Sequence, residues 1–128
     1  MIKYLVVHCS ASPQGRGDTA VSIHRWHQER DFSGIGYHRV ILEDGTVQQG
    51  RPDYWQGAHT RGYNHESLGV CLIGEGGDAT PLQLDALAKV LYDWLDDHPE
   101  AEVLGHNDLY AGKACPAFNV RSWWSERL

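Results

Sequence analysis

Histidine and cysteine are the residues of this chain whose types and spacing could do chemistry. The 128 residues include eight histidines and three cysteines, and imidazole nitrogen and thiolate sulfur are ligands that zinc prefers in proteins. A metal site is therefore the first kind of function to consider. His24 and His27 would share one face of a helix, which makes them one candidate ligand pair.

His8 is another candidate because it ends an apolar run. Residues 2–8 are rich in β-forming residues and are typical of a buried strand. Side chains alternate along a strand, so Val6 and His8 would point to one side and Cys9 to the other. A histidine at a strand end can project into a site, but a hydrogen-bonded structural histidine fits the same position equally well.

Cys115 lies two residues after a cation, Lys113. Pro116 favours an extended backbone at Cys115, and in an extended segment the side chain of Lys113 points the same way. A nearby ammonium group lowers the pKa of a thiol and favours the thiolate that metals bind. A lone cysteine is more often a buried, unreactive thiol, which is the interpretation that we favour for Cys71 and Cys9.

The segment 51–66 has no hydrophobic period and is rich in glycine, histidine and aromatic residues. Long ordered loops usually carry function. Arg51 and His59 are therefore candidate substrate contacts, and Tyr54 and Trp55 could offer stacking surfaces. Aromatic residues in loops also serve as simple packing, so both interpretations stay open.

Length and composition limit the class of protein. A chain of this length corresponds to one domain, so we expect residues 1–128 to form a single unit. The net charge of −6 argues against a nucleic-acid-binding protein, which normally carries a basic surface. No apolar run approaches the roughly 18 residues that a membrane span needs. The first residues do not resemble a signal peptide, so we expect the protein to start in the cytoplasm of the cell that makes it.

Hydrophobic periodicity and turn residues predict an α/β fold, with a central mixed β-sheet flanked by about three helices. Asp44-Gly45 suits the tight turn of a β-hairpin. Thr80, Pro81 and Gln83 form a helix start with a capping box, and an apolar stripe follows them. The predicted strands cover residues 2–8, 38–43, 46–48, 67–73 and 102–104, and the predicted helices begin after Asp18 or Thr19, after Thr80 and after Asn119.

Several separate motifs occur in order along the chain. They are VVHCSAS at 6–12, GYHRVI at 36–41, DGTVQQGR at 44–51, GAHTRGYNHESLGVCLIG at 57–74 and GKACPAFNV at 112–120. Together they resemble the type 2 N-acetylmuramoyl-L-alanine amidase family, whose fold is shared by peptidoglycan-recognition proteins. The resemblance is strongest to the small zinc amidases (endolysins) of phages, and it covers nearly the whole chain.

The resemblance implies one zinc ion per chain, held by His8, His106 and Cys115. It also implies that Tyr37 and Lys113 are catalytic residues. The stretch that leads from His106 to Lys113 is about one residue longer than in the phage relatives, which concerns the shape of this loop and not the ligand set.

The reaction that the resemblance implies is hydrolysis of the amide bond between N-acetylmuramic acid and L-alanine in peptidoglycan. Zinc would polarise the scissile carbonyl and activate water, while Lys113 as a cation and Tyr37 as a phenolic donor would stabilise the oxyanion. We expect His59, Arg51 and Asn64 to contact the substrate. Tyr37 and His59 are both candidates for the general base, with Tyr37 favoured.

Two other functions remain open within this fold. A cytosolic amidase that recycles soluble anhydromuropeptides would usually carry Asp in place of Cys115, and a non-catalytic peptidoglycan-binding module would usually lack this ligand. Some phage relatives also bind the phage RNA polymerase, and no residue of this sequence carries that role over. We expect a monomer that acts on the muramyl peptides of peptidoglycan, binds no nucleic acid and does not insert into membranes. As an endolysin it would reach the wall from the host cytoplasm once the membrane is permeabilised.

Overall fold

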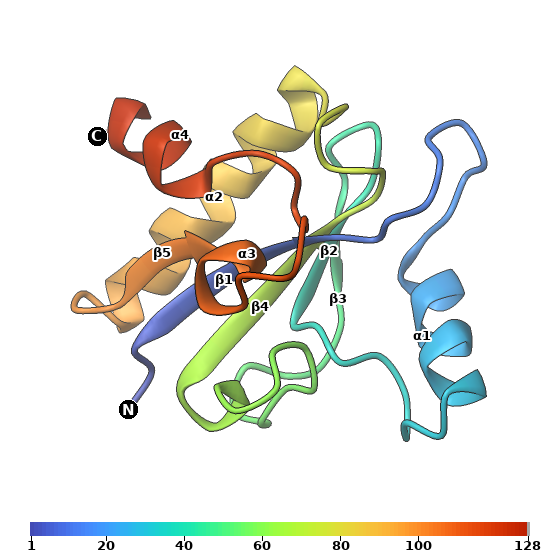
Figure 1. The fold of residues 1–128 in the computed structure, drawn as a ribbon, viewed down its shortest axis with the longest axis horizontal. Coiled ribbons are helices and arrows are strands. Elements are labelled where there is room, and N and C mark those ends of the chain that lie inside the picture. Colours follow the sequence, from blue (N-terminus) through green and yellow to red (C-terminus); the bar gives the residue numbers. More distant parts are fainter. Residues whose placement is uncertain (128) are drawn as a thin grey trace.

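The strands of the protein form one five-stranded mixed sheet (Figure 1). The computed structural model describes residues 1–127. The strands are β1 (Tyr4–Cys9), β2 (Arg39–Ile41), β3 (Val47–Gln49), β4 (Ser67–Leu72) and β5 (Glu102–Gly105). Their order across the sheet is β3-β2-β4-β1-β5, and only the β2–β3 hairpin is antiparallel. The predicted α/β class and the mixed sheet are therefore confirmed.

The described α-helices are the three that the sequence predicts and one short addition, and a 3₁₀ turn that the sequence did not predict accompanies them. The helical segments are α1 (Ala20–Glu29), η1 (Asn64–Glu66), α2 (Pro81–Asp97), α3 (His106–Leu109) and α4 (Val120–Arg127). The unpredicted helix is α3, a single turn at whose start the carboxylate of Asp108 accepts a hydrogen bond of 2.8 Å from the N–H of Gly105. Among the described residues, no helix combines the length and the hydrophobicity that crossing a bilayer requires.

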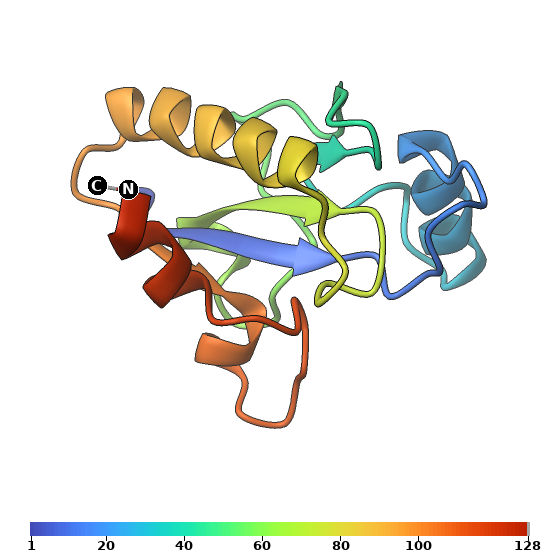
Figure 2. The ribbon, with the colours of Figure 1, turned by 90° about the horizontal axis from the view of Figure 1, so that it is seen from above.

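The longest helix, α2, covers one face of the sheet and builds the main core with it (Figure 2). It begins as predicted: the Thr80 hydroxyl accepts from the N–H of Gln83 at 3.1 Å, and the Gln83 side chain accepts from the N–H of Thr80 at 3.0 Å. Each buried leucine on this face contributes about 1.5–3 kcal/mol of transfer free energy. Its fully buried members include Leu5, Val7, Ile41, Leu68, Val70, Leu72, Leu87 and Leu91.

The opposite face of the sheet carries a smaller core and most of the histidines. Ile23 of α1 packs there against Val40 and Cys71. Because side chains alternate along β4, Leu68 faces α2 whereas Gly69 and Cys71 face the histidines. The sheet thus separates an apolar layer from a layer in which polar chemistry is possible.

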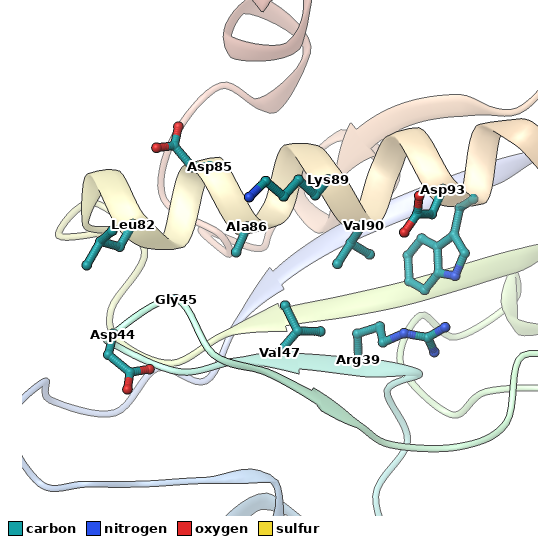
Figure 3. A pocket seen from close by; sticks show the side chains of 11 residues that line it. Arg39, Asp44, Gly45, Val47, Leu82, Asp85, Ala86, Lys89, Val90 and Asp93 are labelled. Atoms are coloured by element: carbon teal, nitrogen blue, oxygen red, sulfur yellow. The ribbon is translucent and has the colours of Figure 1, made fainter.

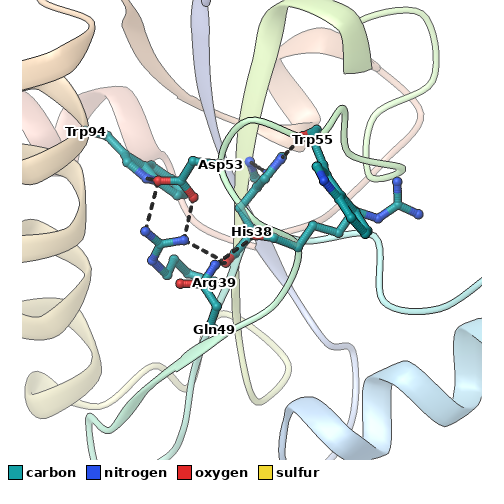
Figure 4. Close-up of polar contacts among 8 residues, drawn as sticks. His38, Arg39, Gln49, Asp53, Trp55 and Trp94 are labelled. Atoms are coloured by element: carbon teal, nitrogen blue, oxygen red, sulfur yellow. Dashed lines mark hydrogen bonds and ion pairs between the residues drawn. The ribbon is translucent and has the colours of Figure 1, made fainter.

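The long loop between β3 and β4 is tied to the rest of the fold at several points (Figure 4). The guanidinium group of Arg39 donates to both carboxylate oxygens of Asp53, at 2.6 and 3.0 Å, and the indole N–H of Trp94 donates to the same carboxylate at 3.1 Å. The Nε2–H of buried His38 donates to the carbonyl of Trp55 at 2.8 Å. These contacts fix the conformation of the loop around Asp53 and Trp55. They thereby help to position the part of the loop that follows, which includes His59.

Candidate active site

The register of the sheet brings two histidines together. β1 and β5 are parallel, with Val7 opposite Gly105, so the next residues along the two chains, His8 and His106, are neighbours. Their ring centroids lie 4.6 Å apart. His8 is buried and His106 is half-buried, which leaves the pair open to solvent on one side.

Cys115 joins the two histidines from the loop between α3 and α4. The ligand atoms of His8, His106 and Cys115 all lie within 4.8 Å of one another. The Sγ atom of Cys115 accepts from the backbone N–H of Cys9 at 3.0 Å, and its carbonyl accepts from the N–H of Asn107 at 2.8 Å. Two imidazole nitrogens and one sulfur are the donor set of a catalytic zinc site with an open fourth position, so these residues fit a zinc ion.

Both histidines of this group are held in the neutral form. Burial, followed by the neighbouring rings of His59 and His106, lowers the pKa of His8 well below its usual value. Burial and the positive charge of Lys113 lower the pKa of His106. Neutral imidazole is the form that coordinates metals, so the surroundings favour metal binding over protonation.

The thiol of Cys115 lies against Cys9, whose backbone N–H donates to the sulfur at 3.0 Å. Contact with the Cys9 side chain, followed by burial, raises the pKa of the Cys115 thiol. The Lys113 side chain is exposed, and its effect on the thiol stays a prediction. Cys71 is fully buried, as expected. A coordinated metal ion is strong enough to deprotonate a thiol outright.

Tyr37 packs against the same cluster from the segment that precedes β2. Its ring centroid lies 5.0 Å from that of His8. Burial, followed by the nearby thiol of Cys71, raises the pKa of Tyr37 well above its usual value. The phenol therefore stays protonated at neutral pH, which suits a hydrogen-bond donor and disfavours a base.

Arg51 and Asn64 use their polar atoms to hold the long loop. Arg51 donates to the carbonyls of Ile35 at 2.8 Å and Gln56 at 2.7 Å. The side-chain oxygen of Asn64 accepts from the N–H of His59 at 2.9 Å. Both residues shape this loop, and their contact with substrate stays a prediction.

His59 lies directly behind His8. Its Nδ1 atom is 2.9 Å from the Nε2 atom of His8. Burial, followed by the ring of His38, lowers the pKa of His59 to about 3, so the ring is neutral at physiological pH and a weak base. The sequence singled out this residue as a substrate contact, and nothing in its pattern pointed to the contact with His8.

The alternative ligand pair, His24 and His27, has a different task. The Nδ1 atoms of the two rings accept backbone N–H groups, from Ile35 and Gly36 respectively, each at 3.0 Å. Within residues 1–127, the group that could hold a metal ion consists of His8, His106 and Cys115 and contains neither His24 nor His27. The two histidines therefore fix the segment that leads into Tyr37.

A groove of about 510 Å³ lies elsewhere, between α2 and the β2–β3 hairpin (Figure 3). Its lining combines apolar side chains with charged ones and contains neither histidine nor cysteine. The groove lies on the α2 side of the sheet, whereas the cluster of His8, His106 and Cys115 does not line it. The charged lining residues are Arg39, Asp44, Asp85, Lys89 and Asp93.

A mixed sheet with two neutral histidines at the ends of the neighbouring parallel strands β1 and β5, joined by a cysteine from a loop, defines a candidate metal-dependent hydrolase. Comparison with known proteins narrows this class. Residues 1–118 match the N-acetylmuramoyl-L-alanine amidase family. The endolysin of Enterobacteria phage K11 is 41% identical over 125 residues, which cover 91% of this chain and 82% of the relative. The endolysin of Escherichia phage T7 is 37% identical over 129 residues, which cover 95% and 85%.

The solved structures agree with the sequence comparison. The N-acetylmuramoyl-L-alanine amidase LysC from Clostridium intestinale superimposes with a TM-score of 0.87 at 26% identity, covering 98% of this chain and 83% of that one. The chain therefore belongs to the N-acetylmuramoyl-L-alanine amidase family. It is an enzyme of the phage-endolysin type that cleaves peptidoglycan, and the resemblance described from its motifs is confirmed.

Proposed function

We propose that this protein is a zinc-dependent N-acetylmuramoyl-L-alanine amidase that hydrolyses the bond between N-acetylmuramic acid and L-alanine and serves as a phage endolysin. The observation that carries the proposal is the convergence of His8, His106 and Cys115, whose ligand atoms lie within 4.8 Å of one another. These residues come from the ends of two parallel strands and from one loop. Their meeting therefore depends on the whole fold.

Zinc suits this donor set because it accepts nitrogen and sulfur together and tolerates an open fourth position. When bound, zinc supplies Lewis acidity toward the scissile carbonyl and toward the attacking water. The cysteine ligand favours a wall-cleaving enzyme over the recycling amidases, which usually carry Asp in place of Cys115.

Tyr37 and Lys113 would stabilise the negative charge that develops on the carbonyl oxygen. The raised pKa of Tyr37 keeps its phenol protonated, so it can donate a hydrogen bond throughout the reaction. The positive charge of Lys113 is close enough to lower the pKa of His106. A hollow of about 110 Å³ beside Tyr37, lined also by His27 and Trp26 among others, offers space for part of the muramyl peptide.

The partners and the place of action follow from the same proposal. The substrate is the muramyl peptide of intact peptidoglycan, and the enzyme acts as a monomer. It reaches the wall from the host cytoplasm after the membrane has been opened. Neither nucleic acid nor a membrane surface takes part in the reaction.

The proposal is tested by digesting purified sacculi with the protein, with and without a zinc chelator, and identifying the products by mass spectrometry. We expect stem peptides with a free L-alanine amino terminus, their loss on chelation and their return on addition of zinc. If sacculi stay intact but soluble anhydromuropeptides are cleaved, the recycling alternative is correct. If folded, zinc-loaded protein only binds sacculi, the protein is a binding module.

A further inference from the structure

The geometry assigns to His59 a role as positioning residue for the metal ligand His8. We propose that His59, oriented by Ser67, fixes the proton of His8 on Nε2 and thereby presents the Nδ1 atom of His8 to the metal. The inference deepens the proposed zinc-dependent function and rests on it. A chain of hydrogen bonds runs from the backbone carbonyl of Tyr63 through Ser67 and His59 to His8.

The first part of the chain fixes the proton of His59. The hydroxyl of Ser67 lies 2.8 Å from the carbonyl oxygen of Tyr63, which can only accept. The single hydroxyl proton of Ser67 is therefore used in that bond. The Nε2 atom of His59 lies 3.3 Å from the same hydroxyl oxygen, so Nε2 must be the donor and must carry the proton of the ring.

The second part fixes the proton of His8. A neutral imidazole carries one proton, so the Nδ1 atom of His59 presents a lone pair to the Nε2 atom of His8 at 2.9 Å. A second lone pair at that distance would be repulsive, and His8 must therefore donate from Nε2. Its Nδ1 lone pair is then free for a metal. The hydroxyl oxygen of Thr60 lies 3.0 Å from the Nδ1 atom of His59 and 3.3 Å from the Nε2 atom of His8, so it contacts both rings.

Two glycines make the slot in which the ring of His59 lies. A Cβ atom built on Gly69 of β4 would lie 2.6 Å from the Cγ and Nδ1 atoms of His59, and one built on Gly57 would lie 2.6 Å from its Cδ2 atom. Both distances are far below van der Waals contact. Glycine inside a strand weakens the strand and marks a close approach, so the sheet gives up a side chain at position 69 to admit this ring.

A histidine that ligates a metal almost always donates its other ring nitrogen to a partner that fixes its tautomer and orientation. In most such sites the partner is a carboxylate or a carbonyl, and here it is a neutral second histidine. Loss of such a partner typically weakens metal binding by about 10–100-fold. The inference therefore predicts a change in zinc affinity that does not depend on measuring catalysis.

The experiment compares zinc dissociation constants, measured by competition with a chromophoric chelator, for a matched set of variants of the full chain. H59F keeps an aromatic ring and removes both nitrogens, and we expect about 10–100-fold weaker binding. H59N keeps an acceptor oxygen at the place of Nδ1, and we expect it to restore most of the affinity. S67A removes the group that orients His59, and we expect a smaller loss.

The control is H65F, because His65 lies in the same loop with its side chain 65% exposed. We expect this variant to bind zinc like the unaltered protein. The inference is overturned if H59F binds zinc as tightly as the unaltered protein. It is also overturned if H59N loses as much affinity as H59F, because the acceptor would then be irrelevant.

A second readout is the protonation of the His8 ring by ¹⁵N NMR of the zinc-free protein. We expect the proton on Nε2 in the unaltered protein and a mixture of the two tautomers in S67A. A proton on Nδ1 would contradict the inference whatever the variants do. If the protein binds no zinc, the proposed function fails, whereas the tautomer still tests the hydrogen-bond chain, including in the event that H59F does not fold.

Discussion

The two faces of the sheet are built in different ways. The face under α2 is held by many interchangeable apolar contacts, so no single side chain defines it. On the other face, His8 and His59 depend on two and three polar side-chain partners, respectively, at fixed distances. The comparison teaches that stability and chemistry are largely separable in this protein, and that variants on one face should spare the property that belongs to the other.

The strongest test of this separation is C115A. The variant removes one of the three proposed zinc ligands and should lose both bound zinc and amidase activity. The fold should persist, because Cys115 is only half-buried and lies in a loop. Zinc content by atomic absorption, sacculus digestion and far-UV circular dichroism measure the three properties. Full activity in a zinc-loaded C115A protein would remove Cys115 from the ligand set.

L68A should lower stability and spare zinc binding, because Leu68 of β4 faces the α2 core and not the candidate site. Leu68 is 1% exposed in the α2 core, and truncating a buried leucine costs about 2–5 kcal/mol of unfolding free energy. Urea unfolding should show this loss at constant m-value. The zinc dissociation constant of the folded variant should stay within about twofold, a range that allows for ordinary non-additivity. A large loss of zinc affinity would show that the two faces are coupled.

K113A should separate metal binding from turnover within the site itself. Removing one oxyanion-stabilising donor typically costs about a hundredfold or more in turnover. Because the Lys113 side chain is exposed and is not a ligand, zinc content and thermal stability should stay unchanged. Initial rates on labelled sacculi give the comparison, and a rate equal to that of the unaltered protein would exclude Lys113 from the mechanism.

G69A adds one methyl group next to Leu68 but on the site face. The new Cβ would press on the ring of His59, and we expect zinc affinity to fall about tenfold, the lower end of the range for a disturbed partner of a metal ligand. Chelator competition measures the change. Comparison with L68A makes the result specific, since the two substitutions occupy adjacent positions in one strand. Unchanged zinc affinity in G69A would mean that the ring has room to move.

T80A should have the smallest effect and should again leave the site alone. Thr80 caps α2 through its bond with the N–H of Gln83, and loss of such a cap costs about 1 kcal/mol. Thermal unfolding measures the change, and sacculus digestion at a temperature well below the midpoint should be unaffected. A drop in specific activity at that temperature would mean that the cap also shapes the site.

How far the sequence predicts this molecule differs between the two faces. The capping box and apolar stripe of α2 are local patterns with a helical period, so its bounds could be predicted closely. The predicted strands also occur, because apolar runs and the Asp44-Gly45 turn depend on neighbours in the chain. α3 escaped prediction because a single helical turn has no period.

The site was predictable only in part. Motifs named His8, His106 and Cys115, and the structure brings them together. The position of His59 behind His8 could not be predicted, because it depends on Gly69 leaving space and on the orientation of the Ser67 hydroxyl. The contact between Cys9 and the sulfur of Cys115 could not be predicted either, because it depends on how the loop that carries Cys115 packs against the end of β1.

The pairing of β1 with β5 also sets an order of events during synthesis. His8 leaves the ribosome before β4 and α2, whereas His106 and Cys115 leave it after them. The three proposed zinc ligands can meet only once β5 has docked beside β1. A chain interrupted between these elements therefore lacks the complete donor set, and competence to cut the wall is acquired only after β5 and the loop of Cys115 have been made.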